Sequence, residues 1–252
     1  MTPAATAFVV AAAFAAGIVD AIAGGGGLLT LPALLAVGLP PQLAIPTNKG
    51  QSTFGKTASF ASYWARGGID RDRAIFAFGA GFVGSCCGAL ALLSMRPEPL
   101  RPVVIVLLTL AAAIVLLRGR IHALARPRKL AHPAVLVVAI GLAMGAYDGF
   151  FGPGVGSLLI VVFTLVFGDT LTRASGNAKV VNLASNLAAL CIFASQGLVL
   201  WRISLPMAAA NALGAIIGAR FALSKGDRLV RAVVLVVVCA VILKLVVDMT
   251  RG

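Results

Sequence analysis

The chain has 252 residues, of which 60% are hydrophobic and only 12% are charged, and its mean hydropathy is +1.02. Soluble domains carry about 25% charged residues and disordered chains few apolar ones, so both classes are excluded. At ~20 apolar residues for each membrane-spanning helix, the length allows roughly eight to ten membrane segments and leaves no room for a separate soluble domain. We therefore expect a polytopic membrane protein.

Charge and motifs narrow the class further. In a soluble protein, the net charge of +13 would suggest a nucleic-acid partner. Here Lys and Arg lie mostly in short segments between apolar runs, as the positive-inside rule describes. The chain has no H-E-x-x-H or G-x-S-x-G motif, so we expect no enzyme, no catalytic residue, no metal and no cofactor. The expected partners are the lipid bilayer and a small anionic substrate, and not nucleic acid.

Apolar runs follow one another along the chain and predict an all-α membrane protein. The runs are continuous, whereas the strands of a membrane barrel alternate apolar and polar residues over ~10 positions. In chain order, the predicted segments are 4–23, 28–39, 43–65, 74–95, 102–117, 133–151, 155–167, 180–200, 203–221 and 232–247.

Two of these segments are too short to cross a bilayer alone. Segments 28–39 and 155–167 have 12 and 13 residues, which is roughly 18–20 Å as helix. Each follows a glycine-rich break, at 24–27 and at 152–154. Irregular backbone at membrane depth persists only where protein or a water-filled cavity surrounds it. Each long–short pair is therefore predicted to form a broken or re-entrant helical hairpin.

The two halves of the chain resemble each other. GIVDAIAGGGG at 17–27 matches GAYDGFFGPGV at 145–155, and the offset between paired residues drifts only from 128 to 130. We expect the paired Gly-x-x-x-Gly motifs to allow close helix packing. The clearest pairs are Asp20 with Asp148, Gly24 with Gly152, Asn48 with Asn177, Lys49 with Lys179, and Gly84-x-x-x-Gly88 with Gly214-x-x-x-Gly218.

Loop charge predicts the orientation of the repeats. If each hairpin enters and leaves on one side, twelve Lys and Arg residues fall on one side and five on the other. The positive-inside rule then makes the first side cytoplasmic and both termini periplasmic. We predict a first repeat at 1–118, a basic cytoplasmic connecting loop at 119–132 and a second, inverted repeat at 133–252. Inverted repeats are typical of secondary transporters, whose substrate sites lie at such breaks.

Ionisable residues accompany both breaks. Asp20 and Asp148 lie four residues before them, where charge is costly and usually marks an ion or substrate route. Both are proton-coupling candidates, and the alternative is that each caps a broken helix end. Lys49 and Lys179 follow polar stretches at equivalent positions. Their charge would attract an anion, although snorkelling at a helix end would also explain them.

Polar groups near these lysines complete a candidate anion site. Helix N-termini after the breaks expose N–H groups and a positive dipole end, which favours an anion over a cation. Other polar residues, including Lys56 seven positions after Lys49, share a helix face with the lysines, and interhelical hydrogen bonding is the alternative explanation for this face. The predicted substrate-binding residues are Lys49, Lys179, Thr47, Asn48, Ser52, Ser175, Asn177, Asn182, Asn186, Gly25, Gly26 and Gly154.

Three motifs resemble a known family. D-A-I-A-G-G-G-G-L-L-T-L-P at 20–32, T-N-K at 47–49 and Y-D-G-F-F-G-P-G-V-G-S at 147–157 resemble the TauE/SafE family of sulfite and organosulfonate exporters, and the last motif looks closest to its YfcA-like branch. The resemblance runs from roughly residue 10 to 247. It implies a multi-pass permease of the bacterial inner membrane for a small sulfur-containing anion. The second half departs from the family, because a Gly-Pro-Gly break replaces a longer glycine run and Pro32 has no counterpart.

The predicted function is therefore secondary transport of an anion such as sulfite, thiosulfate or an organosulfonate, with proton coupling through Asp20 or Asp148. The alternative is an anion channel that uses the same polar face without alternating access. Concentrative, proton-driven flux would exclude the channel. A cation permease fits less well, because only these two acidic groups are embedded and the neighbouring lysines repel a cation.

Overall fold

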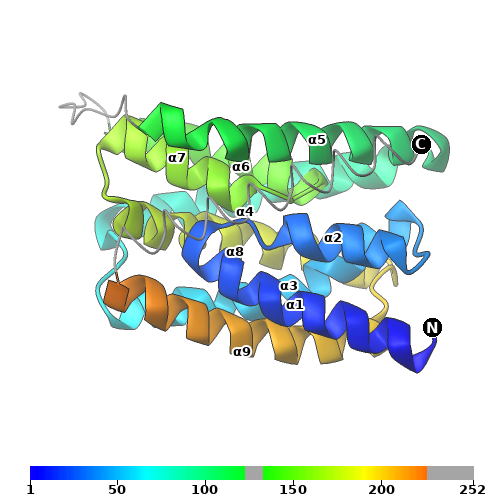
Figure 1. The fold of residues 1–252 in the computed structure, drawn as a ribbon. Helices are drawn as coiled ribbons and strands as arrows, with labels where there is room; N and C mark the ends of the chain where they lie inside the picture. The colour runs from blue at the N-terminus through cyan, green and yellow to red at the C-terminus, as the bar shows by residue number, and fades with distance from the viewer. Residues whose placement is uncertain (123–132, 226–252) are drawn as a thin grey trace.

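A computed structural model describes residues 1–122 and 133–225, and this part of the chain folds into a helical bundle without strands (Figure 1). It agrees with the predicted all-α class. The predicted segment 232–247 and most of the predicted basic loop lie outside the described residues. The described helices are α1 (Pro3–Ala23), α2 (Gly27–Ala36), α3 (Pro41–Ala65), α4 (Arg71–Ser94), α5 (Pro97–His122), α6 (Pro133–Phe150), α7 (Val155–Phe167), α8 (Leu171–Ser195) and α9 (Trp201–Lys225).

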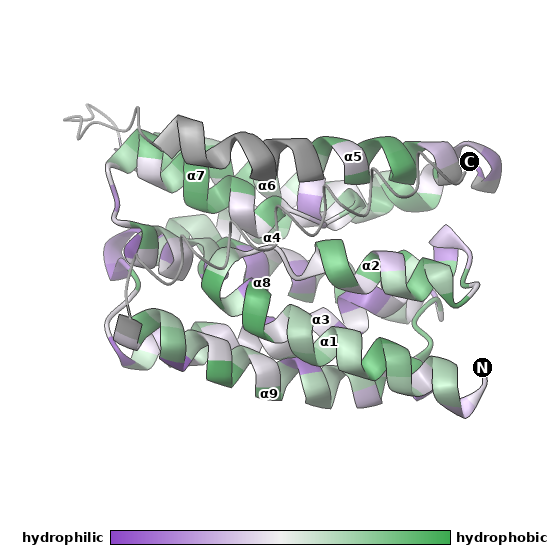
Figure 2. Cartoon of the chain, viewed as in Figure 1, coloured by the Kyte–Doolittle hydropathy of each residue, from purple (hydrophilic) through white to green (hydrophobic). Residues whose placement is uncertain are grey.

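Five of the described helices, α1, α4, α6, α8 and α9, are long and apolar enough to cross a membrane. Apolar residues cover the outside of the bundle, while hydrophilic residues gather at its ends and along the central helices (Figure 2). Large apolar side chains that are more than half exposed occur on several helices and form a surface suited to lipid. They include Phe8, Ile75, Val83, Leu90, Ile105, Leu110, Val135 and Leu213.

The two broken hairpins open toward opposite ends of the bundle. α1 and α2 both have their open ends on the side of the N-terminus, whereas the hairpin of α6 and α7 opens on the other side (Figure 1). The two halves also pack their helices in equivalent ways. α1 packs against α9 as α6 packs against α4, and α3 packs against α9 as α8 packs against α4. This contact pattern is compatible with the predicted inverted repeats.

The predicted Gly-x-x-x-Gly motifs lie where these helix pairs approach most closely. A Cβ atom at Gly84 in α4 would overlap the carbonyl oxygen of Leu142 in α6, and one at Gly214 in α9 would overlap that of Phe14 in α1. The second glycine of each motif meets the partner helix in the same way. Small residues that let backbones touch are a common device for packing helices in membranes.

Helix ends follow from caps and left-handed glycines. The side chain of Asp70 begins α4 by accepting hydrogen bonds from the N–H groups of Asp72 and Arg73. Thr170 begins α8 by accepting a hydrogen bond from the N–H of Arg173. Gly24 ends α1 with φ 74°, a conformation that costs glycine little.

Two predicted boundaries were wrong. α8 begins at Leu171, not at 180, because the polar stretch before Lys179 is helical and buried. α5 continues to His122 and so runs into the predicted connecting loop at 119–132. The predicted start at 180 followed the apolar run alone, but polar groups that find partners inside a bundle do not end a helix.

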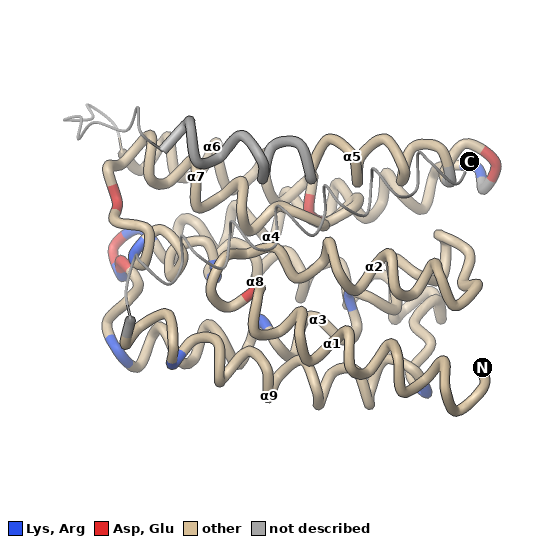
Figure 3. Tube along the Cα trace, in the orientation of Figure 1, with Lys and Arg blue, Asp and Glu red and all other residues tan. Residues whose placement is uncertain are grey.

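Charged side chains gather mainly at the two ends of the bundle. One end holds the α3–α4 and α7–α8 loops, with both basic and acidic residues (Figure 3). It is the end that the charge count predicts to be cytoplasmic. The opposite end holds the N-terminus and the α2–α3, α4–α5 and α8–α9 connections (Figure 1). The loops that were predicted to share a side therefore lie together.

Candidate functional site

The two glycine breaks meet in the interior of the bundle. The N–H of Ser157, in the first turn of α7, donates a hydrogen bond to the carbonyl oxygen of Gly24 at 3.1 Å. The Ser157 hydroxyl donates to the carbonyl oxygen of Ala23 at 2.7 Å. A Cβ at Gly24 would overlap the backbone of Gly156. Two breaks that lie 128 residues apart in the sequence are thus joined backbone to backbone.

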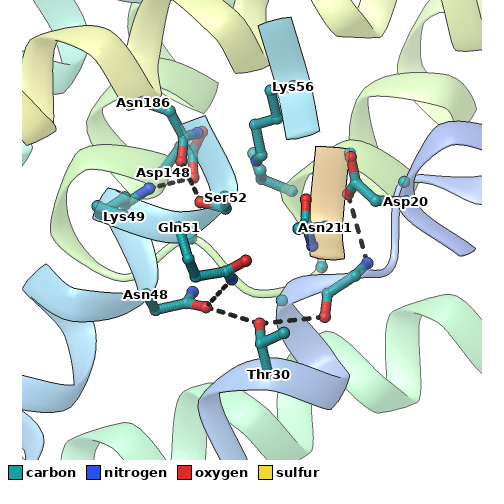
Figure 4. Close-up of a pocket in the computed structure, with 17 residues that line it drawn as sticks. Asp20, Thr30, Asn48, Lys49, Gln51, Ser52, Lys56, Asp148, Asn186 and Asn211 are labelled. Atoms are coloured by element: carbon teal, nitrogen blue, oxygen red, sulfur yellow. Dashed lines mark hydrogen bonds and ion pairs between the residues drawn. The ribbon is translucent and has the colours of Figure 1, made fainter. Parts of the chain in front are cut away.

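A small polar cavity of about 20 Å³ lies beside this junction. The starts of α2 and α7 contribute glycine backbone to its wall, and charged or amide side chains come from α1, α3, α6, α8 and α9 (Figure 4). The lining residues that matter for the site are Asp20, Gly24, Gly26, Thr30, Asn48, Lys49, Gln51, Ser52, Lys56, Asp148, Gly154, Asn186 and Asn211.

Lys49 of α3 forms a tight ion pair with Asp148 of α6. Its Nζ lies 2.6 Å from Asp148 Oδ1, and both side chains are 1% exposed. The other carboxylate oxygen, Oδ2, accepts hydrogen bonds from the Ser185 hydroxyl and from Asn186 Nδ2, the latter at 2.8 Å. Both oxygens of Asp148 are therefore held by donors, which is what a buried carboxylate requires.

Lys179 of α8 forms the repeat-related pair with Asp20 of α1, but this pair is looser. Nζ lies 3.5 Å from Asp20 Oδ2 and also donates a hydrogen bond to the backbone carbonyl oxygen of Asp20. Asp20 Oδ1 accepts a hydrogen bond from the N–H of Gly26 at 3.3 Å. The Asp20 side chain is 11% exposed and lines the cavity.

Each pair joins a lysine of one repeat to an aspartate of the other. Lys49 and Lys179 both lie eight residues inside their helices, which is about 12 Å from the helix start at ~1.5 Å per residue. Their exposed fractions are 1% and 0%. Snorkelling at a helix end is thereby excluded for both lysines. Asp20 and Asp148 hold a buried cation instead of serving only as helix caps.

An amide and hydroxyl network covers another side of the cavity (Figure 4). Asn48 Oδ1 accepts hydrogen bonds from the Thr30 hydroxyl at 2.6 Å and from Gln51 Nε2 at 2.8 Å. The Ser52 hydroxyl donates to Asn186 Oδ1 at 2.8 Å. Within the described chain, the buried Gln51 Oε1 has no hydrogen-bond partner, so this atom is available to a ligand in the cavity.

Several of the predicted binding residues lie away from the cavity. Thr47 accepts a hydrogen bond from the N–H of Leu200. Ser175 accepts one from the Tyr63 hydroxyl. Asn177 accepts one from the N–H of Asp70 and donates to Asp169 Oδ2. These side chains connect helices and loops, which agrees with the alternative explanation of interhelical hydrogen bonding.

The other predicted residues surround the cavity or its rear wall. Asn48, Lys49, Ser52, Asn186, Gly26 and Gly154 line it, together with Asp20 and Asp148. Gly25 lies between lining glycines without being part of the wall, and Asn182 lies behind Gly156. The polar atoms of the Asn182 side chain are buried and have no partner among the described residues.

Lining residues with polar side chains that the sequence did not single out as site residues are Thr30, Gln51, Lys56 and Asn211. Lys56 had a signal, since it shares a helical face with Lys49. Asn211 stands alone in an apolar run, and its Nδ2 donates to the carbonyl oxygen of Ala13 at 2.9 Å. A polar residue in such a run indicates an interhelical contact or a cavity, but the sequence does not say which one.

Ion pairs connect the loops at the end of the bundle that is predicted to be cytoplasmic. Arg73 contacts Asp70 Oδ2 and Asp169 Oδ1, each at 2.8 Å, and Arg173 lies 3.7 Å from Asp70 Oδ2. Burial favours the neutral form of Asp70, but hydrogen bonding and the positive charge of Arg73 outweigh it and hold the pKa of Asp70 below its ordinary value. This ion cluster joins the two repeats, because Asp70 precedes α4 and Asp169 precedes α8.

The fold and the cavity define a multi-pass membrane protein built around two meeting helix breaks. A family model described as sulfite exporter TauE/SafE matches residues 9–245. The chain belongs to this family of membrane transporters, as its motifs predicted. No solved structure matches it.

Curated relatives carry transporter names and have similar lengths. A probable membrane transporter protein, YfcA, of Escherichia coli K12 is 35% identical over 94% of this chain and 87% of its own length. The probable membrane transporter protein ORF9 of a Sinorhizobium species is 33% identical over 97% of this chain and 94% of its own. A probable membrane transporter of Haemophilus influenzae is 33% identical over 93% and 92%. These names agree with a transporter and not an enzyme, and they give no substrate.

Proposed function

We propose that the protein is a secondary transporter that binds a small anion in the cavity between the two glycine breaks. The observation that carries the proposal is the charge of this region: the described chain buries three lysines, Lys49, Lys56 and Lys179, and only two aspartates, Asp20 and Asp148, around the break junction. An excess of buried positive charge is costly unless an anion offsets it.

Backbone geometry supports an anion as well. Gly26, which caps α2, and Gly154, which caps α7, both line the cavity. The N-terminal ends of two helices therefore lie at the cavity, and each carries partial positive charge. Broken helices that direct their N-termini at an anionic substrate are typical of secondary transporters.

A sulfur-containing anion is the substrate that we propose, because the matching family model is described as a sulfite exporter. Sulfite, thiosulfate and organosulfonates share oxygen atoms that accept hydrogen bonds from ammonium and amide groups. We place the protein in the bacterial inner membrane, with the basic end of the bundle in the cytoplasm and the N-terminus in the periplasm, on the charge asymmetry of its loops.

For proton coupling we propose Asp20 rather than Asp148. Asp148 is held at 2.6 Å by its lysine, receives two further hydrogen bonds on its second oxygen and is 1% exposed. Asp20 lies at 3.5 Å from its lysine, is 11% exposed and lines the cavity. Protonation of Asp20 would release Lys179 from its partner carboxylate and would thereby couple proton binding to the charge of the cavity.

Transport in proteoliposomes tests this function. The purified protein is reconstituted, and the flux of sulfite, thiosulfate and an organosulfonate is followed with and without an imposed pH gradient. We expect one of these anions to accumulate against its gradient when the pH gradient is present, and Asp20→Asn to abolish this response. Flux that only equilibrates the anion would favour the channel, and no flux of any anion would refute the proposal.

A further inference from the structure

The two halves of the cavity are equivalent by sequence, but one cation breaks the symmetry. Lys49 corresponds to Lys179, whereas the residue that corresponds to Lys56 is Asn186. Lys56 lies two turns beyond Lys49 on α3, is 8% exposed and lines the cavity. Figure 4 shows its side chain on the same side of the cavity as Asp20 and Asn211.

The other two lysines are already matched by carboxylates. Lys49 is held at 2.6 Å by Asp148, and Lys179 contacts both the side chain and the backbone carbonyl oxygen of Asp20. Lys56 forms neither an ion pair nor a hydrogen bond with any residue in 1–122 or 133–225. Asp20 is the acidic group that acts on it at longer range.

The ionisable groups around the cavity carry a net charge of one positive unit. Each Lys–Asp pair is neutral as a unit, so the two pairs cancel and Lys56 leaves one positive charge. A buried ammonium without a partner is strongly unfavourable, and a bound anion would remove that penalty. An anion with a single negative charge neutralises the cavity, whereas a divalent anion would leave an excess negative charge beside Asp20 and Asp148.

We propose that Lys56 is the residue that binds the transported anion, and that the cavity selects anions with a single negative charge, such as organosulfonates, over divalent ones. The inference rests on the proposed anion transport and specifies its site. Lys49 and Lys179 then act as positioning residues, since they hold the two breaks and the two repeats together. Asn186, at the symmetric position, donates a hydrogen bond to Asp148, accepts one from Ser52 and contributes no charge.

Methanesulfonate and sulfate form a matched pair of probes, because both are tetrahedral and differ in charge. Binding is measured on the purified full chain as anion-dependent thermal stabilisation and converted to affinity by linkage. We expect the wild type to bind methanesulfonate more tightly than sulfate. Lys56→Gln should weaken methanesulfonate binding about 10- to 100-fold, since it removes a charge-assisted hydrogen bond. Lys56→Arg should retain most of the affinity.

Two controls separate charge at the cavity from charge elsewhere and from folding. Arg220→Gln removes a cation at an exposed position of α9 and should leave affinity unchanged. Without anion, Lys56→Gln should unfold at a higher temperature than the wild type, because it removes a buried charge that has no partner. If Lys56→Gln does not fold, Lys56→Met replaces it with a side chain of similar length.

The outcomes distinguish this inference from the proposed function. Wild-type binding that Lys56→Gln leaves unchanged would overturn the role of Lys56 while anion transport stands. Tighter binding of sulfate than of methanesulfonate would overturn the selection for a single charge. If the wild type binds neither these probes nor sulfite and thiosulfate, the proposed function fails and this inference fails with it.

Discussion

The two buried Lys–Asp pairs occupy equivalent positions in the two repeats, yet they are built differently. In the pair of Lys49 with Asp148, the ammonium lies 2.6 Å from the carboxylate and hydroxyl and amide donors hold the second oxygen. In the pair of Lys179 with Asp20, the distance is 3.5 Å, and the lysine also donates to a backbone carbonyl. Sequence symmetry has therefore been retained in residue type but not in geometry.

The difference indicates that the two ion pairs have different roles. A carboxylate that is held by short contacts to several donors serves as a structural link between repeats. A carboxylate that is loosely held and partly exposed can exchange partners or take up a proton. We infer that the tight pair anchors the hairpin of the second repeat, while the loose pair is the part that responds to substrate and protons.

The largest effect should come from Asp148→Asn. This substitution keeps the shape of the side chain but leaves the ammonium of Lys49 buried without a counter-charge. Removing one partner of a buried pair typically costs about 3–5 kcal/mol. We expect a corresponding loss of unfolding free energy in detergent. The double variant Asp148→Asn with Lys49→Met is the control, and it should recover much of that loss because no charge remains unpaired.

Asp20→Asn tests the other half of the comparison and should cost clearly less, about 1 kcal/mol. Lys179 keeps its hydrogen bond to the backbone carbonyl oxygen at position 20, which the substitution does not remove. The same unfolding assay measures both variants side by side. Equal losses of unfolding free energy for Asp20→Asn and Asp148→Asn would show that the two pairs are energetically equivalent. The inferred difference in their roles would then be wrong.

Glycine substitutions test whether the close helix packing is equivalent in the two repeats, although the ion pairs are not. Gly84→Ala and Gly214→Ala each place a methyl group against a carbonyl oxygen of the partner helix. Both should destabilise the protein by a similar amount, about 1–3 kcal/mol, as overpacking does. Gly79→Ala is the matched control on α4, because nothing lies within 4 Å of its added Cβ. It should be stabilising by up to about 1 kcal/mol, the difference in helix propensity.

The smallest effect concerns the ion cluster at the loops. The folded-state pKa of Asp70 lies below its ordinary value of 3.8, so the stability it contributes is fully present above about pH 4. That contribution is lost as the pH falls through the lower, folded-state pKa. Asp70→Asn retains an N-cap side chain and removes the charge. We expect the variant to lose less stability than wild type on acidification, measured as the unfolding temperature between pH 6 and pH 3.

Sequence patterns predicted the elements of the fold because their causes are local. Continuous apolar runs made helices, and glycine runs at 24–27 and 152–154 marked the breaks. Paired Gly-x-x-x-Gly motifs predicted close helix contacts, which Gly84 and Gly214 make. The same reasoning placed the start of α8 too late, because the polar stretch before Lys179 has buried partners and stays helical.

Sequence alone also determined which residue types repeat: an aspartate before each break, and a lysine and an asparagine after it. It could not determine their partners, because Lys49 and Asp148 are 99 residues apart and Lys179 and Asp20 are 159 apart. Contacts over such separations depend on how whole helices pack. The packing of the helices pairs these lysines with carboxylates and uses Asn177 to support a loop. It also places Lys56 at the cavity without an acidic partner in ion-pair contact among the described residues.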